Sequence, residues 1–340
     1  MAIHKERIEY IDLAKGICII LVVLNHTCGE QAGSFIASMN IFRMPLYFVL
    51  SGLFFKHYDF VIFFKKKVNK LLIPFFCAIL FVVLPSELLL NWISKGEFVP
   101  YSFQGEYGRL NLGIIPAAWF LMCLFIVNIY FYCLMMLCKR NVIAISIVGG
   151  ACGVVGYALD YYGIYLPMWL DSSLTALPFF IIGYLTKNNS NMLHDKFTYK
   201  HIIILLLALV VLLASYCFDK SQTAEITILF VYNIFNVNIW SLYIGGVAGT
   251  FFVLILSKYL THIPFVSFVG RYSIVVLLTH QLYIFIICNI LYQLGIPHDS
   301  LEATLGIFVT IMALSIPTIK FCIKYLPYCF AQKDLWRIHN

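Results

Sequence analysis

RIEYIDLAKGICIILVVLNHT, residues 7–27, decides the class of fold. The stretch is as long as the roughly 20 residues that a helix needs to cross a bilayer, and most of it is apolar. A charged side chain such as Asp12 or Lys15 costs roughly 2.5–3.5 kcal/mol within a span on insertion scales. We therefore expect these residues to face a protein interior, which indicates a helix within a membrane bundle.

The whole chain has the same character. Of its 340 residues, 62% are hydrophobic and 11% are charged, whereas a soluble domain carries about 25% charged residues. We predict an all-α, polytopic integral membrane protein whose residues 1–340 form a single transmembrane domain. No cleavable signal peptide is expected, because no small-residue cleavage site follows the first apolar run.

Apolar stretches of spanning length predict about ten transmembrane helices. They lie near 8–28, 36–56, 70–94, 115–138, 141–158, 169–187, 199–217, 240–261, 273–294 and 302–325. The segment 225–239 is also apolar, but it holds Asn233, Asn236 and Asn238. We interpret it as a re-entrant or interfacial piece.

The charges between these spans predict the orientation. Lysines gather in alternate loops, whereas the intervening loops hold only Lys95, Arg109 and Lys220 as basic residues. Cytoplasmic loops of membrane proteins carry such an excess of basic residues, so both termini are predicted to be cytoplasmic. The same distribution explains the net charge of +7 without a nucleic-acid partner.

A polar stripe runs along the first predicted helix. Asp12 and Lys15 are three residues apart and share a face, and Lys15 and His26 are separated by three helical turns. Ile19 and Val22 fall on the same stripe, which rises roughly 16 Å from Lys15 to His26. Asp12 and Lys15 are equally well explained as a structural pair, and His26 alone as an interfacial residue that caps the helix end.

The second predicted span places Arg43 at a depth similar to that of His26. An arginine there suits an anionic or hydroxyl-rich group. Pro45 and Gly52 suit a cavity wall, although Ser51 and Gly52 are better explained as helix-packing residues. The eleven cysteines form no CxxC pair, so we interpret them as packing residues and predict no metal site.

Several segments, in order, resemble the acyltransferase-3 family of bacterial membrane acyltransferases, and most closely the fucose 4-O-acetylase-like subgroup. They are RIEYIDLAKGICIILVVLNHT, FRMPLYFVLSG, KKKVNKLLIPFF, AAWFLMCLF, LDSSLTALPFFIIGYL and GRYSIVVLLTH. The resemblance covers essentially the whole chain. This chain has Arg43 where many relatives have histidine, and Lys67 and Lys70 where relatives often have arginine.

The resemblance implies a multi-pass protein of the bacterial inner membrane that moves an acetyl group from cytoplasmic acetyl-CoA to a sugar hydroxyl. The acceptor would be a cell-surface polysaccharide or a lipid-linked sugar. Lysine neutralises the phosphates of CoA, although without the bidentate geometry of arginine. The donor-binding candidates are Asp12, Lys15, Lys67, Lys70, Arg271 and His280.

The catalytic candidates are His26, Arg43 and Asp171. His26 has a suitable intrinsic pKa for a base that activates a hydroxyl, or it takes the acyl group first. Arg43 would stabilise the oxyanion, and Asp171 would orient His26 or bind the acceptor. Trp119 is a candidate for stacking on a sugar, with an aromatic-belt role as the equal alternative.

Two other functions suit the same sequence. A glycan or lipid transporter would also use a buried charged stripe, although no matching pair of interrupted half-helices is visible. A non-catalytic partner in envelope assembly would not need His26 and Arg43. The expected partners are the lipid bilayer and the glycan, and the oligomeric state is left open, with a homodimer as one candidate.

Overall fold

A computed structural model describes residues 8–32, 38–95, 102–188, 198–223 and 225–336. In these residues the regular secondary structure is helical apart from one two-stranded hairpin and an isolated β-bridge between Gln104 and Leu110. Nine of the described helices are long and apolar enough to cross a membrane. The predicted class, an all-α polytopic membrane protein, is confirmed.

The helices follow the predicted spans closely. In chain order they are α1 (Glu9–Ala32), α3 (Asn40–Leu53), α4 (Phe60–Lys67), α5 (Ile73–Ala78), α6 (Leu84–Lys95), α7 (Trp119–Leu137), α8 (Val142–Tyr161), α9 (Leu170–Asn188), α11 (Tyr199–Gln222), α12 (Gly246–Leu260), α13 (Pro264–Arg271), α14 (Ser273–Gln293) and α15 (Leu301–Tyr325). Short 3-10 turns cover Glu106–Gly108, Pro116–Ala118 and Pro167–Trp169.

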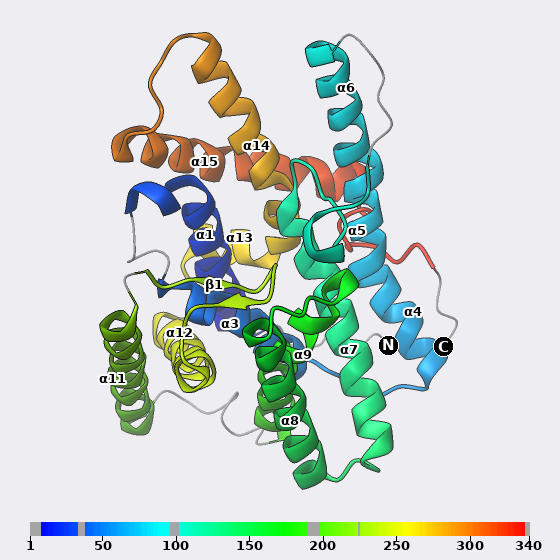
Figure 1. The fold of residues 1–340 in the computed structure, drawn as a ribbon, viewed down its shortest axis with the longest axis vertical. Coiled ribbons are helices and arrows are strands. Elements are labelled where there is room, and N and C mark those ends of the chain that lie inside the picture. Colours follow the sequence, from blue (N-terminus) through cyan, green and yellow to red (C-terminus); the bar gives the residue numbers. More distant parts are fainter. Residues whose placement is uncertain (1–7, 33–37, 96–101, 189–197, 224, 337–340) are drawn as a thin grey trace.

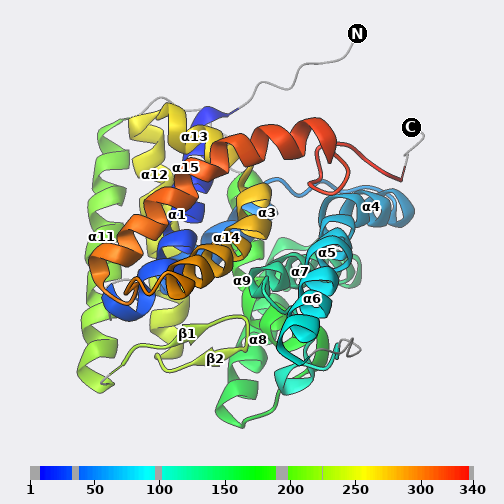
Figure 2. The same ribbon diagram turned by 90° about the horizontal axis from the view of Figure 1, so that it is seen from above.

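Helices α1 and α3 lie in the middle of the bundle. Helix α1 packs on α13, α15 and α12, and α3 packs on α9 and α12. Figures 1 and 2 show α11 at one edge of the bundle and the α4–α6 segment at the opposite edge. The two helices that carry His26 and Arg43 are therefore enclosed by the others.

Helix α3 departs most from the predicted spans, because it has 14 residues where the sequence predicts a span over 36–56. The other nine predicted spans each correspond to a described helix of spanning length. Residues 36 and 37 lie outside the described residues. Most side chains of α3 are buried, so protein rather than lipid surrounds it. A Cβ on Gly52 would lie 1.9 Å from the carbonyl oxygen of Phe180 in α9, which confirms that Gly52 is a helix-packing residue.

The third predicted span begins earlier than expected. The helical segment starts at Phe60 rather than near residue 70, and two π-helical turns, Val68–Leu72 and Ile79–Val83, join α4, α5 and α6. Pro74 follows the first of these turns. Such turns are frequent at functional sites, and the first one contains Lys70.

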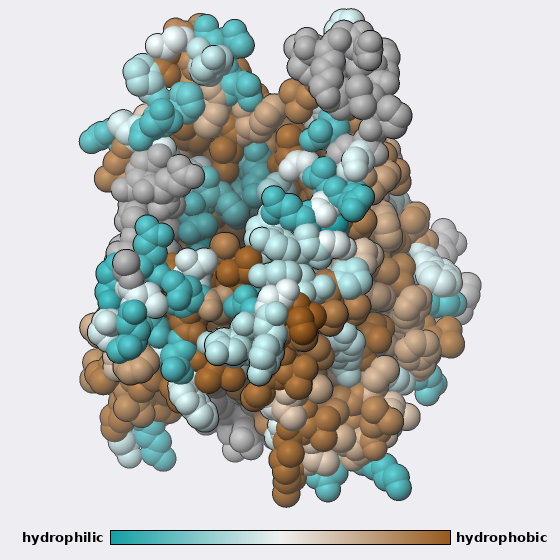
Figure 3. Space-filling view, in the orientation of Figure 1, coloured by the Kyte–Doolittle hydropathy of each residue, from teal (hydrophilic) through white to brown (hydrophobic). Residues whose placement is uncertain are grey.

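Two helices at the edge present apolar side chains outward. On α8, Ile143 and Ile147 are exposed, and on α11, Leu206 and Val210 are exposed. Figure 3 shows broad hydrophobic areas around the lower part of the molecule. In a bilayer these faces would contact lipid chains, as the composition predicts.

The asparagine-rich segment 225–239 forms a hairpin. Strand β1 (Ile228–Leu229) pairs antiparallel with β2 (Ile234–Phe235). Asn233 at its turn is fully buried, accepts from Thr175 at 2.7 Å and donates to the Gly156 carbonyl at 2.8 Å. The hairpin is thereby fixed to α8 and α9.

Candidate active site

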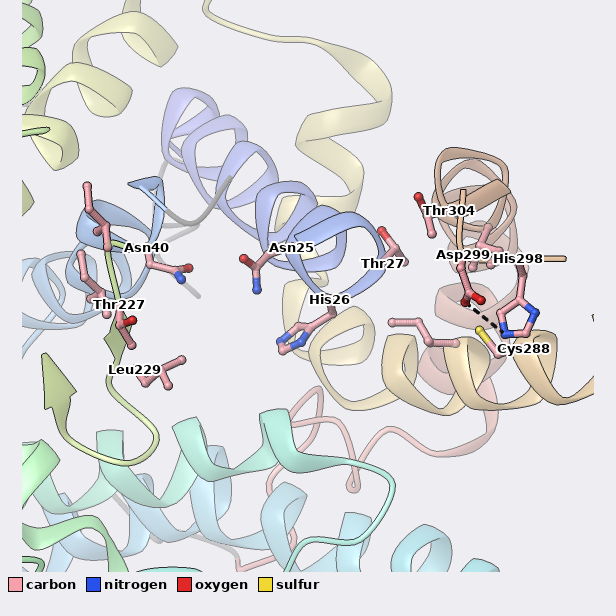
Figure 4. Close-up of a pocket in the computed structure, with 14 residues that line it drawn as sticks. Asn25, His26, Thr27, Asn40, Thr227, Leu229, Cys288, His298, Asp299 and Thr304 are labelled. Atoms are coloured by element: carbon pink, nitrogen blue, oxygen red, sulfur yellow. Dashed lines mark ion pairs between the residues drawn. The ribbon is translucent and has the colours of Figure 1, made fainter. Parts of the chain in front are cut away.

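His26 lies in the wall of a cavity of about 590 Å³. The cavity is lined by the end of α1, the start of α3, the hairpin, the end of α14 and the start of α15: Asn25, His26, Thr27, Asn40, Ile226, Thr227, Ile228, Leu229, Ile284, Cys288, His298, Asp299, Thr304 and Ile307. Figure 4 shows the His26 ring projecting from α1 between Leu229 and Cys288. The space-filling view shows a recess with hydrophilic residues between α14 and the α6 side (Figure 3). We call the cavity that has His26 in its wall the His26 cavity.

A second histidine lies against His26. The ring centroids of His26 and His280 are 5.3 Å apart and tilted by 40°. His280 is fully buried, and its Nδ1 lies 2.8 Å from the Val276 carbonyl oxygen. Its Nε2 is buried without a hydrogen-bond partner among the described residues. The sequence placed His280 with the donor-binding residues, whereas the structure places it beside His26.

The Arg43 side chain reaches from α3 to the backbone of α1. Its guanidinium donates to the Leu21 carbonyl at 2.8 Å, and its own carbonyl accepts from the Cys18 thiol at 3.0 Å. The side chain is buried, and its Nε has no hydrogen-bond partner in the described structure. Arg43 therefore binds the backbone of α1 five residues before His26, and the pairing of His26 with Arg43 stays a prediction.

A different cavity, of about 420 Å³, opens on the first half of α1 and the end of α3. Its walls are mostly apolar and lysines stand at one side: Lys15, Ile19, Met44, Tyr47, Leu50, Ser51, Phe54, Lys67, Lys70, Leu71, Phe120, Leu121, Leu124, Ser273, Ile274 and Leu277. We call it the lysine cavity. It lies along the N-terminal half of α1 and the C-terminal part of α3, whereas the His26 cavity lies at the C-terminal part of α1 and the N-terminal end of α3.

The lysine cavity continues into a smaller basic one of about 280 Å³, the rim cavity. Both are lined by Ser51, Phe54, Lys67, Lys70 and Leu71, and the rim adds Lys56, Tyr58, Phe63 and Lys66. Four lysines from two segments therefore surround one opening. This arrangement suits a ligand with an anionic head and a long apolar arm.

The stripe on α1 joins the two regions. Lys15 and Ile19 line the lysine cavity, Val22 is buried, and His26 lines the His26 cavity. The Lys15 ammonium lies 5.4 Å from the Phe54 ring centroid. One face of α1 thus runs from a basic, apolar-walled channel to a polar chamber, as the spacing of Lys15 and His26 predicted.

Lys70 lines the rim cavity and also binds the segment that follows α15. Its ammonium lies 3.0 Å from the Asp334 carboxylate and donates to the Ala331 carbonyl at 2.8 Å. The Asn69 side chain exchanges two hydrogen bonds of 2.8 Å with the Trp336 backbone. The segment after α15 therefore docks beside the rim cavity, a contact that could not be predicted from the sequence.

Asp171 has a partner other than His26. Its carboxylate accepts from the Arg109 guanidinium at 2.8 Å, and both side chains are almost completely buried. It also accepts from the backbone N–H groups of Leu166 and Ser172 at 3.2 and 2.8 Å. The structure thus engages Asp171 in holding the 102–113 loop against α9 and does not bring it to His26.

The remaining candidates lie apart from the two cavities or beside them. Trp119 is buried, with its ring in a T-shaped contact with Phe120, so it presents no open face for a sugar. Arg271 is exposed at the end of α13 and stacks on Tyr272 at 5.2 Å. Asp12 lies where α1 and α13 cross closely, since a Cβ on Gly270 would fall 1.9 Å from the Asp12 carbonyl oxygen.

The cavities also contain residues that sequence reasoning did not select. Asn25 and Thr27 flank His26, and Asn40 and Thr227 lie across the cavity from other segments (Figure 4). Asn25 and Thr27 could have been selected from the sequence, because they are polar residues next to the candidate base. No group of three or more metal-ligating side chains lies together in the described part of the chain.

This arrangement can hold two ligands at two levels of one face of α1. The neutral amides and hydroxyls of the His26 cavity suit a hydroxyl-rich compound. The lysines of the rim suit phosphate. His26 provides a base in the wall of the His26 cavity, and Arg43 provides a buried cation bonded to the same helix at Leu21.

Comparison with protein families gave one match. The model of the acyltransferase domain called Acyl_transf_3 matches residues 8–321, nearly the whole chain. Neither the search of curated proteins nor the search of solved structures found a match.

Proposed function

Because the chain belongs to this acyltransferase family and is therefore a membrane acyltransferase, we propose that it is an O-acetyltransferase. It moves an acetyl group from acetyl-CoA to a hydroxyl of a cell-surface polysaccharide or a lipid-linked sugar. One observation carries the proposal: the lysine cavity and the His26 cavity meet the same face of α1 at two levels. A transporter or a non-catalytic partner is not adopted, since the family is one of acyltransferases.

The donor occupies the lysine and rim cavities. Lys56, Lys66, Lys67 and Lys70 bind the phosphates of CoA, since charge-assisted hydrogen bonds to phosphate are stronger than neutral ones. The pantetheine arm extends between the apolar walls toward Ile19 and Leu277. Leu277 is three residues before His280, so the thioester end of the arm approaches the pair of histidines.

The acceptor occupies the His26 cavity and reacts directly. His26 removes the proton of the acceptor hydroxyl, and the oxygen attacks the carbonyl carbon of the thioester. When the tetrahedral intermediate collapses, the carbon–sulfur bond breaks, the ester forms, and CoA leaves as a thiolate that takes up a proton from His26. We favour direct transfer over an acyl-histidine because His26 lines the acceptor cavity rather than the donor channel.

Two residues assist His26. Arg43 stabilises the negative charge on the carbonyl oxygen; its buried Nε has no hydrogen-bond partner among the described residues. His280 packs against the His26 ring and holds its position. His280 itself is buried and oriented by its contact with the Val276 carbonyl, so it gives the exposed His26 ring a fixed support.

The location follows from the same geometry. Acetyl-CoA is a cytoplasmic metabolite, so the lysine side of the bundle faces the cytoplasm and the His26 cavity faces the outer side. This agrees with the orientation expected from the loop charges. We propose that the protein resides in the bacterial inner membrane, with both termini cytoplasmic.

The test is the release of CoA thiol and the transfer of labelled acetyl by the purified protein. We expect His26→Ala to lower the rate of acetyl transfer by about 10²–10⁴-fold, the usual contribution of a general base. The control is His262→Ala, an exposed histidine beside Glu9 at the other end of α1, which should keep the wild-type rate. A folded His26→Ala protein that transfers acetyl at the wild-type rate would contradict the mechanism.

Direct transfer has a separate test. After mixing with labelled acetyl-CoA and rapid quenching, we expect no acetyl label on the protein at a stoichiometry that matches turnover. Label on His26 that forms and decays at the catalytic rate would replace the direct step with an acyl-histidine.

A further inference from the structure

A third cavity, of about 670 Å³, lies beside the His26 cavity and has no part in the mechanism above. It is lined by the loop before α7, the 3-10 turn before α9 and the hairpin turn: Gln104, Gly105, Glu106, Arg109, Leu110, Asn111, Leu112, Gly113, Pro116, Trp169, Val231 and Tyr232. We call it the tyrosine cavity, for the aromatic group at its edge. Residues 226–229 line the His26 cavity and residues 231–232 line the tyrosine cavity, so one hairpin borders both.

Three tyrosines from three separate segments contact one another beside this cavity, and one of them, Tyr232, lines it. The Tyr107 ring centroid lies 4.2 Å from that of Tyr165 and 5.6 Å from that of Tyr232. The Tyr107 side chain is 43% exposed, so the cluster is not closed in a core. Burial and the nearby carboxylate of Glu106 raise the pKa of Tyr232, so its hydroxyl remains a hydrogen-bond donor at neutral pH. Such a group offers both ring surface and polar edges.

Two buried donors belong to residues of the cavity lining. The Nε of Arg109 and the Nε1 of Trp169 lack a hydrogen-bond partner among the described residues, although both side chains are almost fully buried. Buried polar groups without partners are uncommon because they cost about 1–3 kcal/mol each. A ligand rich in oxygen acceptors would relieve that cost.

The backbone around the cavity is also unusual. Tyr107, Trp169 and Asn233 have positive φ values of 56°, 61° and 54°, in the left-handed region that non-glycine residues seldom adopt. They lie in three different turns at or next to the lining. Such conformations cost free energy and are found preferentially at binding sites.

We propose that the tyrosine cavity is a second saccharide-binding subsite, so that the acceptor is an extended glycan. Its aromatic rings contact the apolar faces of a sugar ring, and Glu106, Gln104 and the unpartnered donors bind hydroxyl and ring oxygens. The sugar that receives the acetyl group lies in the His26 cavity, and the next units cross the 226–232 hairpin. This inference rests on the proposed function.

The test measures binding as a function of glycan length. The envelope polysaccharide of the source cell is cut into mono- to tetrasaccharides, and each is titrated against the full-length protein in detergent, with saturation-transfer NMR as the readout. We expect the tri- and tetrasaccharides to bind at least tenfold more tightly than the monosaccharide. The Tyr107→Ala/Tyr232→Ala double variant should lose this difference.

A matched control and a second variant keep the test decisive. Tyr161→Ala/Tyr162→Ala removes two tyrosines that are 82% and 72% exposed at the end of α8 and should bind each length as the wild type does. Glu106→Gln, at an exposed side chain, should weaken binding of the longer glycans without affecting folding. Wild-type binding that does not depend on length, or a double variant that keeps the length dependence, overturns the subsite.

Failure of the subsite and failure of the proposed function are distinguishable. A protein that releases CoA thiol in a His26-dependent way but binds all lengths equally keeps the function and loses the subsite. A protein that binds longer glycans through Tyr107 and Tyr232 but consumes no acetyl-CoA keeps the subsite and loses the function.

Discussion

Replacing Asp171 with asparagine tests whether this carboxylate serves the fold or His26. The contacts of the Asp171 carboxylate indicate a role in the fold. It accepts hydrogen bonds from Arg109 at 2.8 Å and from the N–H groups of Leu166 and Ser172 at 3.2 and 2.8 Å. The side chains of Asp171 and Arg109 are 0% and 2% exposed. The variant therefore leaves a buried guanidinium without a counter-charge. Its amide keeps one acceptor oxygen, whereas the N–H₂ group that replaces the other oxygen can only donate.

The expected loss follows from that burial. Removing one partner of a buried ion pair destabilises by about 3–5 kcal/mol, because the remaining charge is uncompensated. We expect Asp171→Asn at the lower end of that range, since one oxygen acceptor remains. The double variant Arg109→Met/Asp171→Leu should recover most of the loss, because an apolar pair of similar volume needs no counter-charge.

The assay pairs unfolding with activity. Denaturant titration of the protein in mixed micelles gives the free energy of unfolding, and CoA thiol release per folded molecule gives the catalytic rate. We expect Asp171→Asn to lose stability while the rate per folded molecule stays within about twofold of wild type. Full stability with a rate reduced a hundredfold would refute this reasoning and return Asp171 to a role with His26.

Three further predictions concern the donor site and the packing of α3. Lys67→Met should raise the KM for acetyl-CoA about tenfold, the equivalent of one charge-assisted hydrogen bond of about 1.5 kcal/mol, and should reduce the salt dependence of KM; an unchanged KM would remove Lys67 from the site. Asp334→Asn should lower the same KM by up to about fivefold, because it frees Lys70 from an exposed pair worth up to about 1 kcal/mol; a higher KM would show that the C-terminal segment assists the donor. Gly52→Ala should destabilise by about 1–3 kcal/mol through overpacking against α9, whereas Gly150→Ala, where a Cβ meets nothing within 4 Å, should not; equal unfolding free energies for the two variants would contradict the close α3–α9 contact.

The sequence by itself determined the membrane class, most helix bounds and the stripe on α1. These depend on contiguous residues: a run of apolar side chains is long enough to cross a bilayer, and a spacing of eleven residues brings Lys15 and His26 onto one face. The length of α3 was overestimated, because hydropathy does not separate a helix surrounded by lipid from one buried among other helices. Both environments are apolar.

Only the tertiary structure decided which side chains meet. His280 lies beside His26, and Arg109 binds Asp171 across 62 residues of chain. Asp334 binds Lys70, and the tyrosine cavity joins three turns that are distant in sequence. In a membrane, lipid is as apolar as a buried side chain, so the hydrophobic pattern does not select helix partners. Close approach at residues such as Gly52 and Gly270, together with buried polar contacts, selects them, and these depend on the whole bundle.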